Sequence, residues 1–120
     1  MIARPATEAD GSAVRPESAS ERGSDSAQAV DATDALCAAF LALETPDEVR
    51  RFLVDLCTPA EIRALTERWH VARLLDRGDL SYRAINEATG VSTATIVRVA
   101  RFLRDEPHQG YRIVLDRQKA

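Results

Sequence analysis

The stretch TGVSTATIVRV, residues 89–99, contains the features that decide the fold. Gly90 permits the left-handed backbone that ends one helix, and Ser92 can accept hydrogen bonds from the free amides that begin the next. Small residues follow Ser92, and branched apolar residues then recur at helical spacing. Two short helices joined by a tight glycine turn form a helix-turn-helix, so we predict helices over residues 82–89 and 93–104.

The second of these helices has two different faces. At about 100° per residue, its large apolar residues fall on one side, which should pack inward. They are Ile96, Val99, Ala100 and Leu103. The opposite side begins with a slender first turn, and bulk at that turn would hold the backbone away from the bases of a DNA major groove. This arrangement is typical of a recognition helix.

We expect seven residues of this unit to contact double-stranded DNA. Hydroxyls and methyl groups at the helix tip suit base edges, and arginines suit phosphates. The expected contacts are Arg83, Ser92, Thr93, Ala94, Thr95, Arg98 and Arg101. An exposed arginine is often only a solvated charge, and this alternative stays open for Arg101. A purely structural helical corner is the alternative for the whole unit.

Helical signals continue on both sides of this unit, whereas hairpin turns and sustained strand alternation are absent from the sequence. The segments TPDE at 45–48 and TPAE at 58–61 each combine a hydroxyl N-cap, proline at the first helical position and glutamate three residues after the cap. We therefore predict four more helices, over residues 33–43, 46–57, 59–77 and 109–117. The expected fold class is all-α.

The first 32 residues differ in composition from the rest. They are rich in Ala, Ser, acidic residues and Arg, and they cannot bury enough apolar surface to offset their chain entropy. We predict a disordered arm over residues 1–32 and a folded domain over residues 33–120. Because 88 residues make a small core for a monomer, a core shared between two chains is expected.

The net charge of −3 is distributed unevenly. The arm carries three arginines and six acidic residues, whereas residues 63–104 carry eight arginines and four acidic residues, a local net charge of +4. A polyanion responds to the local field more than to the total charge. The basic segment contains the helix-turn-helix, which agrees with DNA binding.

Several other classes of protein have little support. Cys37 and Cys57 lie in apolar stretches and are interpreted as buried free thiols; a disulfide or metal pair is the alternative. His70 and His108 do not complete a ligand set, so no metal site is expected. The sequence shows no nucleophile–base pair, no phosphate-binding loop and no paired carboxylates in a recognisable arrangement, so we do not expect an enzyme. Without an apolar run near ~20 residues or a signal-like N-terminus, we expect a cytoplasmic, nucleoid-associated protein without membrane contact.

The order and spacing of several motifs resemble a known family. LCT precedes a long arginine-rich helix, GDLSY and TGVSTATIVRV follow at characteristic spacing, and ETPDEVRRFLVDLC and GYRIVL flank them. Over residues 36–115 this is similar to the tryptophan repressor superfamily, and most closely to its YerC/YecD branch. The resemblance implies an intertwined, tryptophan-repressor-like helical homodimer that uses its helix-turn-helix to bind DNA.

The resemblance also bears on a ligand. Two arginines sandwich the corepressor in the tryptophan repressor, and their positions match Arg68 and Arg98 here. The small residues that leave room for the indole correspond to Val99 and Phe102, whose bulk should fill the cavity. We therefore expect no cofactor and no tryptophan corepressor, and Arg68 is alternatively an ion-pair former. Whether another small molecule acts as an effector stays open.

Two functions are compatible with these observations. The first is a dimeric, sequence-specific transcriptional regulator, expected to be a repressor, whose recognition helices contact half-sites about one helical turn apart. The second is a helical dimeric interaction module that no longer binds DNA. The acidic arm could also occupy these arginines and so compete with DNA for them.

Overall fold

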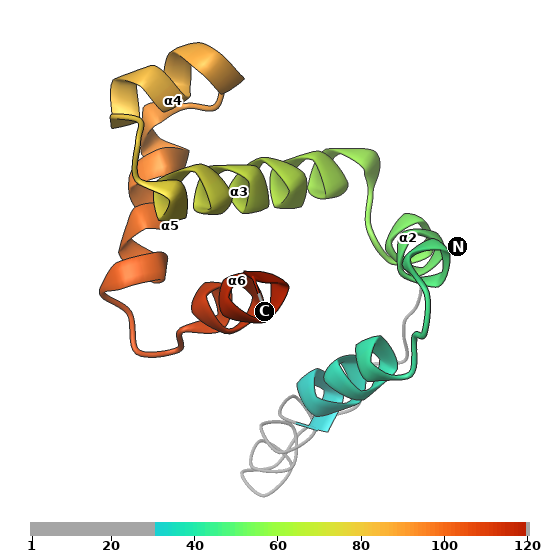
Figure 1. Ribbon diagram of the computed structural model, residues 1–120. Coiled ribbons are helices and arrows are strands. Elements are labelled where there is room, and N and C mark those ends of the chain that lie inside the picture. The colour runs from blue at the N-terminus through green and yellow to red at the C-terminus, as the bar shows by residue number, and fades with distance from the viewer. Residues whose placement is uncertain (1–30, 120) are drawn as a thin grey trace, which may run out of the picture. The chain divides into compact units, whose positions relative to one another are not determined.

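The structure of the protein, a computed structural model, describes residues 31–119. This part of the chain contains six helical segments and no strand, which confirms the all-α class (Figure 1). The arm predicted over residues 1–32 lies outside the described residues, except that residues 31 and 32 are helical. The described residues divide into two compact units, residues 31–49 and 50–119.

The described part of the first unit consists of a helix over residues 31–41 and the start of α2 (Pro46–Leu56). The first helix was predicted to reach Leu43, but it ends earlier because Leu43 donates to Phe40 in a tighter last turn. Thr45 caps α2 as predicted, since the amide of Glu48 donates to its hydroxyl at 3.1 Å. The carboxylate of Glu48 accepts from the amide of Glu44 at 2.8 Å.

The second unit contains the rest of α2 and four further helices. They are α3 (Pro59–Arg77), α4 (Tyr82–Thr89), α5 (Thr93–Arg104) and α6 (Gly110–Lys119). The predicted bounds of α3, α4 and α5 are confirmed, and α2 ends one residue before the predicted Cys57. Helix α6 begins one residue after the predicted start, because Gln109 has a left-handed φ of 57° and precedes the helix.

Local caps explain why α3 begins and ends where it does. At its start, the amide of Glu61 donates to the Thr58 hydroxyl at 3.1 Å, and the Glu61 carboxylate accepts from the Thr58 amide at 2.8 Å. These two bonds form the predicted capping box. At its end, Gly78 takes a φ of 80°, and its amide donates to Leu74. A side chain with a Cβ is strained at that φ, which is why a glycine ends the helix.

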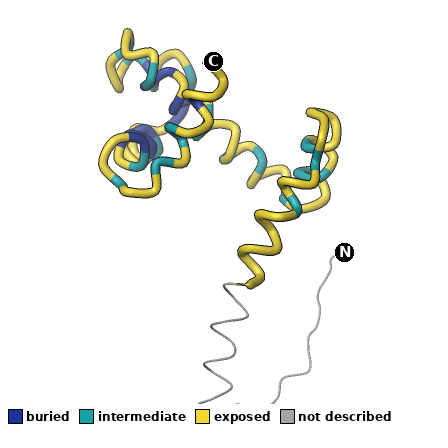
Figure 2. Tube along the Cα trace, turned by 60° about the horizontal axis from the view of Figure 1, so that its bottom comes forward, coloured by how far each residue is buried: buried dark blue, intermediate teal, exposed yellow. Residues whose placement is uncertain are grey.

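The core of the second unit lies around α5. This helix packs against α3, α4 and α6, and Figure 1 shows it crossing the C-terminal half of α3. The buried residues are apolar: Val71, Ala72, Leu74, Leu75, Ile85, Val91, Ile96, Val99, Ala100, Leu103 and Leu115. They form a cluster within α3–α6, as Figure 2 shows. The predicted inward face of α5 is therefore confirmed.

An ion-pair cluster joins α6 to α3. Asp76 accepts from Arg112 at 2.8 Å and from Lys119 at 2.7 Å, and its side chain is 12% exposed. Hydrogen bonds from Lys119 and Arg112 lower the pKa of Asp76 below its ordinary value of 3.8. The contact therefore persists at neutral pH and ties the C-terminal helix to the long helix.

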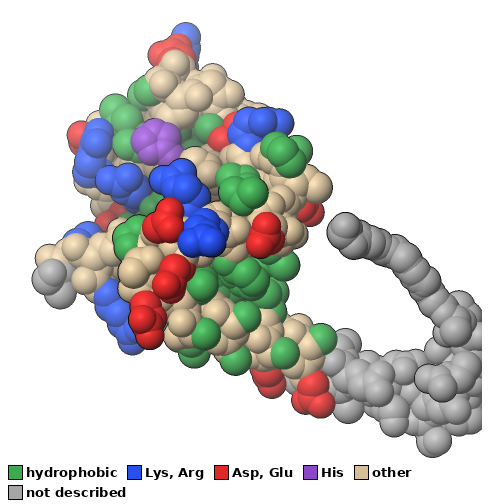
Figure 3. Space-filling view, turned by 90° about the vertical axis from the view of Figure 1, so that its right-hand side faces the viewer, with side chains coloured by type: hydrophobic (Ala, Val, Ile, Leu, Met, Phe, Trp, Pro, Cys, Tyr) green, Lys and Arg blue, Asp and Glu red, His purple; other side chains and the backbone are tan. Residues whose placement is uncertain are grey.

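Several large apolar side chains of the first three helices are not covered. Leu36 and Leu41 of the first unit are 41% and 86% exposed, and Val54 and Leu65 of the second unit are 62% and 46% exposed. Figure 3 shows hydrophobic side chains on the visible surface of the molecule. The apolar spacing along residues 59–77 predicts that Leu65 turns inward, and this prediction is wrong for the single chain. Exposed apolar side chains in such number are typical of a surface that another chain covers.

The two cysteines are also more exposed than the sequence predicted. Both were interpreted as buried free thiols, but Cys37 is exposed and Cys57 is only half-buried; both are free. The apolar stripe that contains Cys37 is not covered by other residues of the described chain. The burial prediction is therefore corrected, and the free-thiol prediction is confirmed.

Candidate nucleic-acid interface

The first turn of α5 is capped, and its tip is open to solvent. Ser92 has an extended backbone (φ −64°, ψ 150°), and its hydroxyl accepts from the amide of Thr95 at 3.2 Å. The hydroxyls of Ser92 and Thr95 also lie 3.0 Å apart. Thr93 and Ala94 are exposed, and Thr95 is half-buried. The structure thus brings four of the predicted contact residues together at one slender helix end.

The turn before α5 is held more firmly than the sequence indicated. Gly90 has a φ of 76°, and its amide donates to the carbonyl of Asn86. The side-chain amide of Asn86 donates to the carbonyl of Val91 at 2.7 Å, and the amide of Val91 donates to the Thr89 hydroxyl at 3.1 Å. Sequence reasoning missed Asn86 and Thr89, although Asn and Thr before a turn glycine are a known turn signal.

Beneath the tip, the two helices are joined by fully buried apolar contacts. Ile85 of α4 and Ile96 of α5 are both 0% exposed, and Val91 in the turn is 4% exposed. Residues with this burial sit in close-packed surroundings and lose their rotational freedom. The underside therefore fixes the direction in which the first turn of α5 points.

The predicted arginines lie along the exposed surfaces of the two helices. Arg98 and Arg101 of α5 place their guanidinium carbons 4.5 Å and 5.0 Å from the centre of the Phe102 ring. Arg101 also lies 3.5 Å from a carboxylate oxygen of Glu106. Arg83 of α4 pairs with Glu87 at 3.3 Å, with side chains that are 88% and 64% exposed. Such an exposed pair is weak and leaves Arg83 able to meet a phosphate.

Comparison with known proteins now places this geometry in a family. A family model described as "Trp repressor protein" matches residues 31–119. The chain belongs to the Trp repressor protein family. The match includes all six helical segments of the described chain, and both halves of the helix-turn-helix lie inside it.

Individual relatives agree with this assignment. The chain is similar to a Bacillus subtilis (strain 168) protein named "Uncharacterized protein YerC", with 44% identity over 86 residues that cover 72% of this chain and 81% of that protein. Among solved structures, it is similar to a TrpR-like protein from Eubacterium eligens (TM-score 0.68, 42% identity, covering 74% of this chain and 90% of that one). It is also similar to a putative Trp repressor from Staphylococcus aureus (TM-score 0.69, 40% identity, 74% and 87% covered). The resemblance to the YerC/YecD branch is confirmed.

The Trp repressor family member described here does not bring its two candidate ligand arginines into one cavity. Nε of Arg68 donates to the carbonyl of Ala64, one turn earlier in α3, at 3.3 Å. Among residues 31–119, Arg68 forms no ion pair, so its suggested role as an ion-pair former is not realised within one chain. Trp69, the next residue, lines the cavity beside Arg98 instead.

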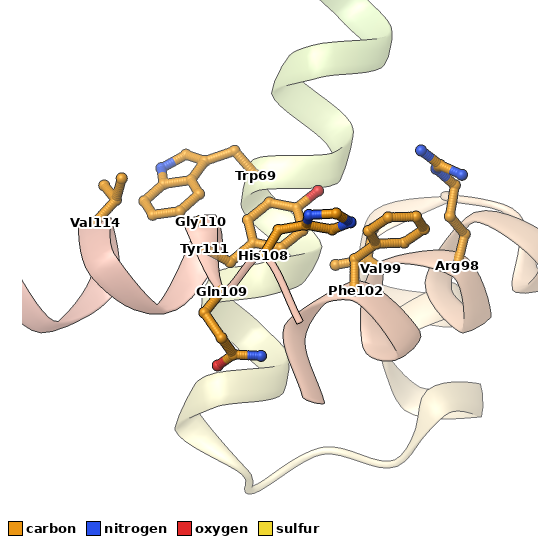
Figure 4. Close-up of a pocket in the computed structure, with 9 residues that line it drawn as sticks. All are labelled: Trp69, Arg98, Val99, Phe102, His108, Gln109, Gly110, Tyr111 and Val114. Atoms are coloured by element: carbon orange, nitrogen blue, oxygen red, sulfur yellow. The ribbon is translucent and has the colours of Figure 1, made fainter. Parts of the chain in front are cut away.

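That cavity lies between α3, α5 and the segment that begins α6. It has a volume of about 480 Å³ and is lined by Trp69, Arg98, Val99, Phe102, His108, Gln109, Gly110, Tyr111 and Val114. Figure 4 shows the Phe102 ring between Arg98 and His108. Val99 is buried in the core and Phe102 lies along the wall of this cavity. The expectation that these two residues exclude an indole stays a prediction.

Sequence reasoning also missed one contact between the two helices of the unit. Nη1 of Arg104, in the last turn of α5, donates to the hydroxyl of Tyr82 at 3.2 Å. Tyr82 is the first residue of α4 and is exposed. The contact spans 22 positions in the sequence, so no local spacing could have indicated it. It places a second basic side chain on the surface that carries Arg101.

Metal-ligand clusters and membrane-spanning helices are both absent from residues 31–119. No group of three or more His, Cys, Asp or Glu side chains there could hold a metal ion. No helix in the same residues is long and apolar enough to cross a bilayer.

Proposed function

We propose that the protein is a homodimeric, sequence-specific DNA-binding regulator that acts as a repressor by covering a promoter. Thr93, Ala94 and Thr95 would enter the major groove, and Ser92 would cap the helix beside the backbone. Arg83, Arg98 and Arg101 would meet phosphates, where a guanidinium can donate two hydrogen bonds at once. The observation that carries the proposal is a capped, uncharged helix tip that is exposed on top and rigidly packed beneath.

The tip suits a groove for steric and electrostatic reasons. Its first turn contains no residue larger than threonine and no acidic residue, so the backbone can approach base edges closely without repelling phosphates. The free amides at the start of α5 favour a negative partner. Hydroxyls at this position can donate to or accept from base edges, and their methyl groups can contact thymine.

The proposed homodimer rests on the uncovered apolar surface. Leu41 in the first unit and Val54 in the second are each more than half exposed, and α2 contains no buried residue. A second copy of the chain would cover such helices and enlarge a core that is small for one chain. Sedimentation at micromolar concentration should give twice the chain mass of 13.2 kDa. A mass of 13.2 kDa would contradict the homodimer.

We further propose that DNA binding needs no tryptophan, because Arg68 bonds to its own helix and does not line the cavity beside Arg98. Titration of the DNA complex with tryptophan should leave the affinity unchanged. A tighter complex in its presence would overturn this part of the proposal. Another small molecule could still act through the cavity.

Selection of bound sequences from a random duplex pool tests the proposed function. The purified protein should enrich a palindromic sequence with half-sites about one helical turn apart. A parallel selection with a protein lacking residues 1–32 separates competition by the acidic arm from absence of binding. If neither protein enriches any sequence, DNA binding is refuted and the interaction-module function is favoured.

A further inference from the structure

The C-terminal end of α5 holds an acidic side chain against an arginine that we expect to meet DNA. Nε of Arg101 lies 3.5 Å from Oε2 of Glu106. The amide of Glu106 donates to the carbonyl of Arg101 at 3.1 Å, so the helix end itself brings the carboxylate close to the guanidinium. This backbone bond fixes the separation of the two residues, so their side chains are within reach of each other.

A histidine reaches the same carboxylate from the other side. Nε2 of His108 lies 4.0 Å from Oε1 of Glu106. The imidazole is also stacked on the Phe102 ring at a centroid distance of 6.4 Å, and Figure 4 shows this ring between His108 and Arg98. The guanidinium groups of both Arg98 and Arg101 lie over the same ring. Glu106 thus has an arginine at one oxygen and a titratable imidazole at the other.

We propose that Glu106 competes with the DNA backbone for Arg101, and that protonation of His108 relieves this competition. The proposal rests on the proposed DNA-binding function. Carboxylate and phosphate oxygens use the same N–H donors of a guanidinium, so Arg101 cannot serve both fully. Glu106 is therefore a positioning residue that acts through Arg101 and lowers the affinity for DNA at neutral pH.

The direction of the pH effect follows from charge. A neutral imidazole leaves Glu106 paired with Arg101 alone, whereas a protonated imidazole offers Glu106 a second cation and weakens its hold on Arg101. Acidification that protonates the imidazole should therefore strengthen DNA binding. Around His108, α5 presents the cations Arg98 and Arg101, α6 presents Tyr111, and α3 presents the uncharged Trp69. Among these named neighbours of His108, Glu106 is the one acidic side chain.

A double-mutant cycle tests the competition with four proteins: the parent, Glu106→Gln, Arg101→Gln and the double variant. Their affinities are measured by fluorescence anisotropy on a mixed-sequence duplex of about 30 base pairs at low salt, because phosphate contacts do not depend on sequence. Glu106→Gln should tighten binding about three- to tenfold in the parent and by less than about twofold in the Arg101→Gln background. An equal gain in both backgrounds would show general charge repulsion and overturn the proposal.

Asp105→Asn is the matched control, since Asp105 is adjacent and exposed and forms no side-chain pair with Arg101 among the described residues. It removes the same formal charge and should improve binding less than Glu106→Gln does. An equal improvement would contradict a specific role of Glu106.

The histidine is tested by repeating the titrations at about pH 7.5 and 5.5. Parent and His70→Gln should bind more tightly at the lower pH, by about two- to fivefold, whereas His108→Gln should not. His70 is an exposed histidine on α3 and is the control. A pH dependence that survives in His108→Gln would overturn the role of His108.

A readout without DNA separates this inference from the proposed function. The Arg101 Nε–H signal in NMR spectra should shift when Glu106 is replaced by Gln, and should shift with pH in the parent but not in His108→Gln. If no protein of the series binds DNA while these shifts occur, the proposed function fails and the contact stands. If the Arg101 signal does not respond to Glu106→Gln, the contact itself is refuted.

Discussion

The two ends of α5 have opposite characters. Its first turn is capped by Ser92 and carries small, uncharged side chains. Its last turn crowds Arg101 and Arg104 against acidic and aromatic neighbours, which include Glu106 and Phe102. One helix thus separates two tasks: the bare end can approach base edges, while the charged end can bind phosphates and is partly neutralised by its own chain. Under the proposed function, the difference teaches that shape would carry specificity, whereas charge would adjust affinity.

The largest expected effect comes from breaking the support beneath the bare end. Ile96→Asp places a carboxylate at a position with 0% exposure, among buried apolar side chains that offer it no hydrogen-bond donor and no cation. We expect a loss of more than about 3 kcal/mol in the free energy of unfolding. Urea denaturation followed by circular dichroism measures it. A variant as stable as the parent would show that the underside does not hold the helix.

The adjacent position should respond differently. Thr95→Glu puts an acidic side chain at the third position after the cap Ser92, where it completes a capping box, so the helix should keep its stability. The same carboxylate would face phosphates and bases, and specific DNA affinity should fall by about 100-fold or more. Anisotropy titration and thermal melting are the two measurements. Unchanged affinity would mean that the tip does not enter the groove.

A smaller effect is expected along the charged side of α5. Arg98→Gln should weaken binding about fivefold for all duplexes alike and lower the salt slope by about one for each protomer. Titrations at several salt concentrations check both values. A loss confined to the selected sequence would instead indicate that Arg98 reads a base. Arg117→Gln, an exposed position at the end of α6, is the matched control and should behave like the parent.

The smallest effect concerns the attachment of α6. Because the pKa of Asp76 is lowered in the folded chain, its contribution to stability is present above the ordinary pKa of 3.8 and is lost as the pH falls below it. Asp76→Asn should therefore lower the melting temperature at pH 7 and have progressively less effect below about pH 4. Differential scanning calorimetry across this range is the measurement. A difference that is constant with pH would contradict an ionic role.

These comparisons also show what the sequence can and cannot reveal. The bounds of α3, α4 and α5 were predictable because Thr58, Gly78 and Gly90 are caps whose chemistry is local. The bare tip was predictable for the same reason. The Arg101–Glu106 pair was not, because it forms across a helix end and not at the spacing of four residues within a helix.

Burial was predicted less well than helix position. Periodicity indicates which side of a helix is apolar but not which surface covers it, so Leu65 and Cys37 were expected inside and lie exposed in the single chain. The size of the space beside Phe102 was not predictable, because it depends on the position of that ring and on the path of residues 108–111, which also line it. Neither of these can be read from side-chain size alone.

The position of Ala94 relative to DNA tests the central claim most directly. Ala94→Cys in a Cys37→Ser, Cys57→Ser background can carry a DNA-cleaving label, with Gln118→Cys on α6 as the control. On the selected duplex, the account predicts cleavage from position 94 at two sites about one helical turn apart, within the major groove, and little cleavage from position 118. Equal cleavage from both positions, or none from position 94 on bound DNA, would contradict it.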